Sequence, residues 1–244
     1  MESNLHHQFL TVRRGGIVSY GGNQSWFDHG YMRKSGCGVI CSMDLLLYLN
    51  MYKAKCSTEF FQELLLQSTV ENHTSANTIP MGTIHNVVME EDYSYLANQL
   101  HWKYFPVIPH LGMPGWSIVM GLNRYFRKYR VPLRASWGLQ GRLLWKRMEE
   151  MLKKDIPVIL AVGPNFPFTW TNHKLAFYMK KRDGGYERTC SVKAHFVTVT
   201  AMNDTWIRIS SWGKEYYIKR KEYMSYVKKY SSFLVSNLIY IKEI

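Results

Sequence analysis

The sequence predicts an α+β fold in which a mostly helical part, residues 1–155, packs on a mostly antiparallel β-sheet, residues 156–244. Two observations lead to this prediction. Apolar residues recur with helical spacing in several stretches of the first part, whereas short segments rich in valine, isoleucine and threonine fill the second. With 46% hydrophobic and 15% aromatic residues, the 244-residue chain can bury a sizeable core, and we expect one domain over 1–244.

The first part begins with residues 1–36, whose glycine, serine and aromatic content predicts strand and loop. A helix is predicted over 38–51, because apolar residues form a wide stripe along GVICSMDLLLYLNM. A second helix is expected after Ser57, which is a suitable N-cap residue. Three more helices are predicted at about 92–101, 116–130 and 139–154, and Val131-Pro132 ends the middle one.

The second part opens with IPVILAVG (156–163), a continuous apolar run that is typical of a buried strand. Three alternating segments predict antiparallel strands: AHFVTVTAM (194–202), TWIRIS (205–210) and KEYYIK (214–219). The aromatic-rich segment 164–178 lies between the first two of these four strands. It is expected either to line a substrate cleft or to form a surface loop.

The balance of charges is basic, with 31 Lys and Arg against 18 Asp and Glu and a net charge of +13. This charge favours acidic partners, but the basic residues are spread along the chain, so we expect a solvated basic face and no nucleic-acid partner. No apolar run is long enough to span a membrane, and the first residues lack the apolar region of a secretory signal. We therefore expect a cytoplasmic protein with reduced thiols, whose oligomeric state the sequence leaves open.

The four cysteines, Cys37, Cys41, Cys56 and Cys190, have spacings that match no zinc site and no redox pair. Phosphate-binding loops, dinucleotide-binding fingerprints and metalloprotease motifs are also missing from the sequence. No metal and no cofactor is therefore predicted.

Cys37 is the first candidate for chemistry, because SGCGVIC (35–41) places it between two glycines at the start of a predicted helix. The positive end of the helix dipole and the free N–H groups there favour a thiolate, and the same N–H groups can stabilise an oxyanion. Gly36 and Gly38 would leave room for a substrate to approach. The alternative is that Cys37 is a small apolar filler of the core, which is the role expected for Cys41.

His195 is the best-placed base among the nine histidines, because it begins a Val/Thr strand late in the chain. An early cysteine and a late histidine are the order found in papain-type hydrolases. The alternative is an inert histidine at the edge of a strand.

The segment SSWG (210–213) followed by YYI resembles the segment that follows the catalytic histidine strand in papain-like cysteine peptidases. SGCGVICSMDLLLYL, IPVILAVGPN and HFVTVTAM are more similar to the bacterial bacteriocin-processing (double-glycine) peptidase branch of that superfamily. These stretches cover about a third of the chain. The resemblance implies a papain-like fold in which the nucleophile helix packs on the sheet.

The resemblance also implies roles for individual residues. Cys37 would be the nucleophile, His195 the general base and acid, and Gln24 the side-chain donor of the oxyanion hole. Gln24 lies further from Cys37 than the family's glutamine does, and the usual position holds Tyr31. Ser210 stands where the family has its Asn or Asp, the residue that orients the histidine. The residues expected to line the substrate site are Trp26, Gly36, Gly38 and Trp212, the last as a shield over His195.

Together these residues predict a thiol hydrolase, a cysteine peptidase or amidase, that forms an acyl-enzyme on Cys37. An acyltransferase on the same fold is an alternative, because it differs only in whether an amine or water takes the acyl group. A catalytically inactive binding module is a second alternative, because Ser210 and Gln24 both depart from the family pattern.

Overall fold

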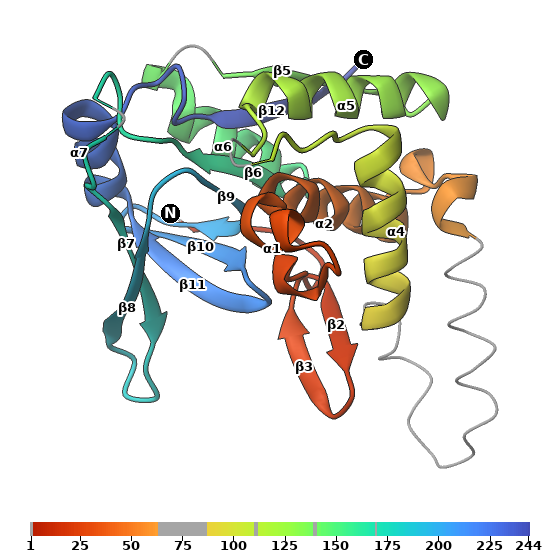
Figure 1. The fold of residues 1–244 in the computed structure, drawn as a ribbon, viewed down its shortest axis with the longest axis horizontal. Helices are drawn as coiled ribbons and strands as arrows, with labels where there is room; N and C mark the ends of the chain where they lie inside the picture. The colour runs from red at the N-terminus through yellow and green to blue at the C-terminus, as the bar shows by residue number, and fades with distance from the viewer. Residues whose placement is uncertain (1, 63–86, 110–111, 139–140, 169) are drawn as a thin grey trace.

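The computed structural model describes residues 2–62, 87–109, 112–138, 141–168 and 170–244. They form a mixed α+β fold, in which a large antiparallel sheet is accompanied by several helices (Figure 1). The helices of the first part lie beside the sheet and above it in this view, and one continuous hydrophobic core runs through both parts of the chain.

Within the described residues the large sheet has nine strands in the order β5-β12-β6-β9-β10-β11-β7-β8, with β1 also paired to β9. Every pairing in it is antiparallel. The strands are β1 (Ser3–Asn4), β5 (Leu133–Trp137), β6 (Val158–Val162), β7 (Leu175–Lys180), β8 (Tyr186–Val192), β9 (His195–Met202), β10 (Trp206–Ser211), β11 (Lys214–Lys219) and β12 (Leu238–Glu243). The strands predicted from IPVILAVG and from the three alternating segments are confirmed as β6, β9, β10 and β11.

A small sheet lies apart from the large one and has the order β3-β2-β4. Its strands are β2 (Thr11–Arg14), β3 (Ile17–Tyr20) and β4 (Val87–Met89), with β2 parallel to β4. The short 3-10 helix η1 (Gln24–Trp26) follows shortly after β3, so this sheet helps to fix the position of Gln24.

The helices with described bounds are α1 (Gly30–Ser35), α2 (Cys37–Tyr52), α4 (Glu90–Lys103), α5 (Gly115–Lys128), α6 (Leu144–Lys153) and α7 (Arg220–Tyr230), with 3-10 turns η2 (Ala54–Cys56) and η3 (Gly141–Leu143). The helices predicted at 38–51, 92–101 and 116–130 are confirmed as α2, α4 and α5. The helix predicted at 139–154 is shorter than expected: residues 139–140 lie outside the described residues, Gly141–Leu143 form η3, and α6 begins at Leu144. The helix expected after Ser57 begins at Glu59, and its residues beyond 62 lie outside the described residues.

Three expectations about the first part need correction. Residues 1–36 contain the helix α1 as well as strands, and residues 1–155 supply β1 and β5 to the large sheet. α2 also lacks the one-sided stripe expected of it, because every residue from Gly38 to Asn50 is buried. It is a central helix that packs on β9 and β6 on one side and on α4 on another.

Candidate active site

Cys37 and His195 come together because α2 begins at the first and β9, against which α2 packs, begins at the second. Both side chains line one narrow pocket with a volume of about 10 Å³, which is roughly the space of a single water molecule. The other residues that line it are Gly22, Gln24, Ile40, Cys41, Asp44, Phe196, Ser210 and Ser211.

The thiol lies among backbone N–H groups. Those of Phe196, Gly38 and Cys37 itself face the sulfur and lower its pKa, but burial has the larger effect and raises the pKa of Cys37 above its ordinary value. Burial also lowers the pKa of His195 to about 4. Burial thus favours the neutral form of both groups and opposes the thiolate that the start of the helix is predicted to favour.

His195 is held by Ser211 rather than by Ser210, which corrects the prediction. His195 Nε2 lies 2.8 Å from Ser211 Oγ, whereas Ser210 Oγ donates a hydrogen bond of 2.7 Å to the carbonyl of Tyr20. Successive side chains of a strand point to opposite faces, so only one of two adjacent serines can meet the histidine. With Nε2 next to Ser211, Nδ1 is the ring nitrogen that remains for another partner.

Trp212 covers His195, as predicted. Their rings stack with centroids 4.6 Å apart and planes inclined by 21°. Trp212 and Gly213 form the two-residue turn between β10 and β11, with φ values of 50° and 70°. Both residues of such a tight hairpin turn adopt the left-handed conformation, which costs a residue with a Cβ about 1 kcal/mol.

Gln24 lines the pocket and Tyr31 does not. The Gln24 Nε2 group donates to the carbonyl of Arg33 at 2.8 Å, and an amide NH₂ keeps a second hydrogen for another acceptor. Arg33 in turn donates to the carbonyls of Phe27 and Asp28, so η1 and α1 are tied together. Tyr31 Oη instead lies 3.2 Å from His101 Nε2.

The two glycines beside Cys37 serve packing. A Cβ on Gly36 would lie 2.5 Å from the carbonyl oxygen of Met32, and a Cβ on Gly38 would lie 3.0 Å from Ile118 Cδ1. An added Cβ would thus meet the protein's own atoms and not the space for a substrate. Neither glycine lines the pocket. Trp26 does not line it either, since its ring packs edge-on against Tyr93 at 5.8 Å. Trp212 is absent from the lining as well, so none of the four residues expected to line the substrate site lines this pocket.

Asp44 is the residue of the pocket that the sequence analysis missed, together with Ser211. Its carboxylate accepts hydrogen bonds from Tyr93 Oη at 2.7 Å and from the N–H of Gly22 at 3.1 Å. Burial raises its pKa to about 7, even though both hydrogen bonds act in the opposite direction. A usable signal was present, because Asp44 is the one acidic residue in the apolar stretch GVICSMDLLLYLNM.

Neither a metal site nor a membrane-spanning helix is found in the part of the chain that the structure describes. No group of three or more His, Cys, Asp or Glu there could hold a metal ion. No helix among the same residues has the length and apolar character to cross a bilayer.

Comparison with known proteins found no protein similar to this chain. No family model matches the chain, and searches of curated proteins and of solved structures found no similar protein. The pocket that holds Cys37 and His195 is therefore the feature from which a function can be inferred.

Proposed function

We propose that the chain is a thiol hydrolase of the papain-like superfamily, near its bacteriocin-processing branch, and that it acts on a peptide or another amide. One observation carries the proposal: a cysteine at the start of a helix, a histidine at the start of the strand packed on it, and a buried glutamine amide line the same pocket. Acyl transfer to a thiol needs this grouping, since nucleophile, base and oxyanion donor must meet at one carbonyl.

In the proposed first step, His195 Nδ1 takes the thiol proton while Cys37 Sγ forms a bond to the substrate's carbonyl carbon. The carbonyl electron pair moves to oxygen, where the N–H of Cys37 and the free hydrogen of the Gln24 amide stabilise it. The C–N bond then breaks and the proton passes from His195 to the leaving amine. Water attacks the resulting thioester, again with His195 as base, and releases the acid and the free thiol.

The protonation states support this sequence of steps. His195 has a pKa of about 4, so its imidazole is neutral and able to accept a proton over the whole range above that pH. If Nε2 carries the ring hydrogen and donates it to Ser211, the lone pair of Nδ1 is available to Cys37. Ser211 would thus select the tautomer that the first step requires.

A non-catalytic module of the same architecture is the second candidate, and the size of the pocket favours it. A volume of about 10 Å³ does not admit a substrate carbonyl with its two substituents, so catalysis requires the pocket to widen. An acyltransferase shares the first half of the proposed reaction and differs in the acceptor.

The test measures the acylation of Cys37 by a small activated ester, p-nitrophenyl acetate. Peptide mapping by mass spectrometry follows acetyl groups on each thiol over time. We expect Cys37 to react faster than Cys56 and Cys190, His195→Ala to lower its rate by roughly a hundredfold, and Gln24→Ala by roughly tenfold. Cys190→Ser is the matched control, since this half-buried thiol lies outside the pocket.

Equal acetylation of Cys37, Cys56 and Cys190, with no effect of His195→Ala, would contradict the hydrolase and favour the non-catalytic module. If Cys37 does react selectively, the fate of the acetyl group separates the two enzymes. Release of acetate indicates a hydrolase, whereas transfer to an added primary amine in preference to water indicates an acyltransferase.

A further inference from the structure

The connection between β6 and β7 exposes three large aromatic side chains within five residues. Phe166 is 45% exposed, Phe168 56% and Trp170 78%, and the rings of Phe168 and Trp170 are 5.2 Å apart. Water contact with so much clustered apolar surface is unfavourable, and soluble proteins rarely leave such clusters without a partner. These three residues are called the aromatic tip below.

The base of this connection is firmly braced, so the exposure of the aromatic tip does not reflect a lack of structure. Asn165 is 1% exposed, and its Oδ1 accepts hydrogen bonds from the N–H of His173 and from Thr171 Oγ1. Its Nδ2 donates to the carbonyl of His173, and Lys193 Nζ donates to the carbonyl of Thr171. The polar base therefore holds the rings in an outward position before any partner binds.

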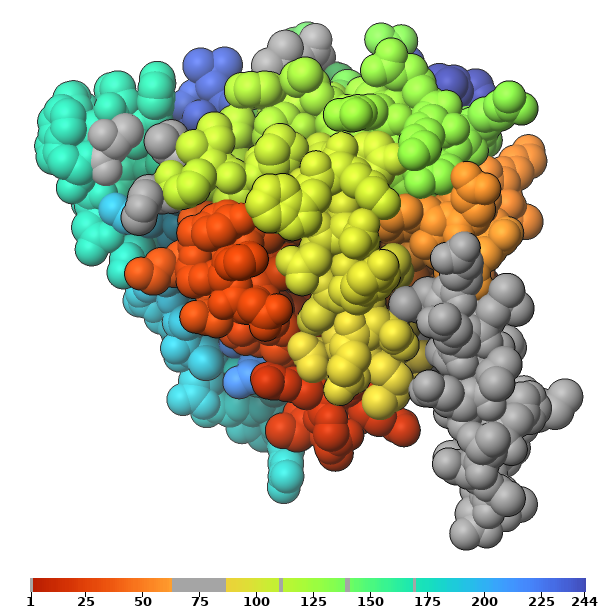
Figure 2. Space-filling view, turned by 45° about the vertical axis from the view of Figure 1, so that its right-hand side comes forward, coloured from red at the N-terminus to blue at the C-terminus, as the bar shows by residue number. Residues whose placement is uncertain are grey.

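Lysines surround the aromatic tip. The N–H of Phe166 donates to the carbonyl of Tyr230, which places the tip beside the end of α7, where Lys228 and Lys229 are exposed. Lys174, four residues after Trp170 in the chain, is also exposed. None of these three lysines forms an ion pair with a carboxylate of the described residues. In Figure 2 the teal residues that follow 169 form a lobe at the upper left edge of the molecule.

We propose that the aromatic tip and these three lysines bind the surface of an anionic lipid membrane. Aromatic rings favour the headgroup region of a bilayer, and unpaired lysines behind them are attracted to anionic headgroups. The tip projects from the molecule and so suits a broad, soft surface better than a single extended peptide, which needs a groove. The net charge of +13 strengthens the attraction at long range.

This inference does not depend on the chemistry of Cys37. The Cys37→Ser variant is expected to bind membranes as the wild type does, so failure of one proposal leaves the other standing.

The experiment is sedimentation of the full chain with vesicles of phosphatidylcholine alone and with vesicles that also contain phosphatidylglycerol. We expect binding to the anionic vesicles that weakens as salt is added, and much weaker binding to the neutral ones. Trp170→Ala is expected to lower the affinity for anionic vesicles at least tenfold. The double variant Lys228→Gln/Lys229→Gln is expected to lower it roughly 30-fold.

Matched controls separate this site from general adhesion. Trp102→Ala removes an equally exposed tryptophan on α4, and Lys55→Gln/Lys242→Gln removes two exposed lysines elsewhere. Both controls should bind as the wild type does. The proposal is overturned if the wild type ignores anionic vesicles, or if the controls lose as much affinity as the tip variants. Binding to single-stranded RNA is measured for the same proteins. The proposal is also overturned if no protein in the set binds vesicles while the tip variants lose binding to this RNA, because the patch would then bind nucleic acid.

Discussion

Cys37 and His195 line the same pocket, and burial favours the neutral form of each, which bears on how the thiol should react. Burial moves the two pKa values apart, upward for the thiol and downward to about 4 for the imidazole. A pair that exchanges its proton at rest would need the opposite order of pKa values.

We therefore expect the rate of Cys37 alkylation by iodoacetamide to rise steadily with pH from 6 to above 9. The thiolate fraction grows tenfold with each pH unit below the thiol pKa, which burial places above its ordinary value of 9.0. Mass spectrometry of the alkylated peptides gives the profile for each cysteine. A flat rate between pH 5 and 8 that His195→Ala abolishes would show an ion pair instead.

Two adjacent serines provide a matched comparison of position. Ser211→Ala removes the hydrogen-bond partner of His195 Nε2, and we expect acylation of Cys37 to fall roughly tenfold. Ser210→Ala removes the hydrogen bond to Tyr20 and should cost about 1 kcal/mol of stability while the rate changes less than about twofold.

The nitrogen-15 shifts of the His195 ring distinguish positioning from a general loss of stability. They should report a changed mixture of tautomers in Ser211→Ala alone. Equal rates for the two variants, with unchanged ring shifts, would remove Ser211 from the proposed mechanism.

At the scale of elements, α2 is a helix surrounded by the core, and it carries a carboxyl group within that core. Asp44 is 1% exposed and bound by Tyr93 and Gly22, and burial raises its pKa to about 7. The folded state thus binds this proton more tightly than the unfolded chain does, where the pKa is near the ordinary 3.8. The contribution of Asp44 to stability is complete below about pH 4 and is lost as the pH rises to about 7.

The Asp44→Asn variant tests this, because its side-chain oxygen can accept the same two hydrogen bonds but never ionises. Between pH 4 and 7 the unfolding free energy of the wild type should fall relative to the variant, by up to about 1.4 kcal/mol for each pH unit. Denaturant titrations at several pH values measure the difference. Parallel curves for the two proteins would show that Asp44 keeps an ordinary pKa.

Helices and strands with a clear pattern of apolar residues along the sequence were predictable, and those with a weak pattern were not. IPVILAVG and the alternating segments predict β6 and β9 to β11. A strand buried on both faces is a continuous apolar run, and a strand buried on one face alternates apolar and polar residues. β8 lies at the edge of the sheet, and its exposed Glu187 and Arg188 interrupt any apolar alternation. α1 has only six residues, and contacts of Arg33 with η1 hold it in place, which no local pattern reveals.

The candidate site divides in the same way. Cys37 and His195 were predicted from residue type and from their order along the chain, and Gln24 from the resemblance to the papain-like family. Ser211 was missed because the match to a family motif pointed to Ser210. The alternation of Ile207 and Ile209 in the same strand does place residue 211 on their buried face, so the sequence held the information.

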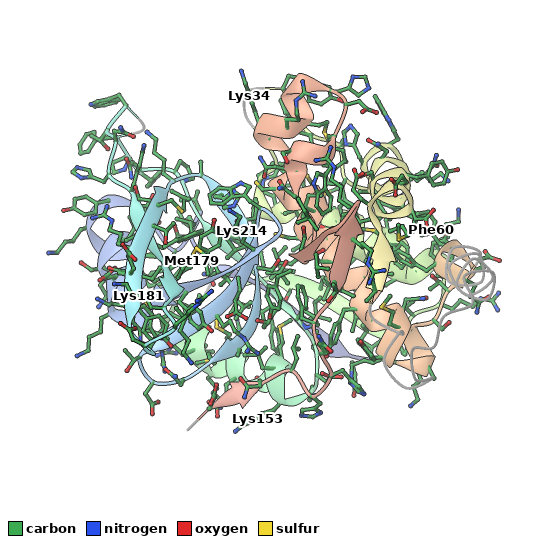
Figure 3. All side chains as sticks on the ribbon, turned by 90° about the horizontal axis from the view of Figure 1, so that it is seen from below. Lys34, Phe60, Lys153, Met179, Lys181 and Lys214 are labelled. Carbon is green, nitrogen blue, oxygen red and sulfur yellow. The ribbon has the colours of Figure 1, made fainter. Side chains whose placement is uncertain are left out.

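At the scale of the whole molecule, the two parts of the chain meet around the pocket. The N–H of Tyr20 donates to the carbonyl of Gly213, and the N–H of Gly213 donates to the carbonyl of Gly22. These bonds join the end of the small sheet to the β10–β11 turn. Seen from below, Lys34 of α1 and Lys181 beyond β7 lie well apart, and Lys214, next to this turn, lies between them (Figure 3).

The bonds at Gly22 and Gly213 belong to one connected set, since Asp44 on α2 also accepts from Gly22, and Gln24 donates to the carbonyl of Arg33 on α1. Contacts that share partners in this way are expected to open as one cooperative unit. We expect the amide hydrogens of Tyr20, Gly22 and Gly213 to exchange with deuterium at one shared opening free energy. The Asp44→Ala variant should lower this opening free energy for all three amides together. Faster exchange at Gly22 alone would mean that the loop before Gln24 opens independently of the rest. Such a local opening would give a substrate its own entrance to the narrow pocket.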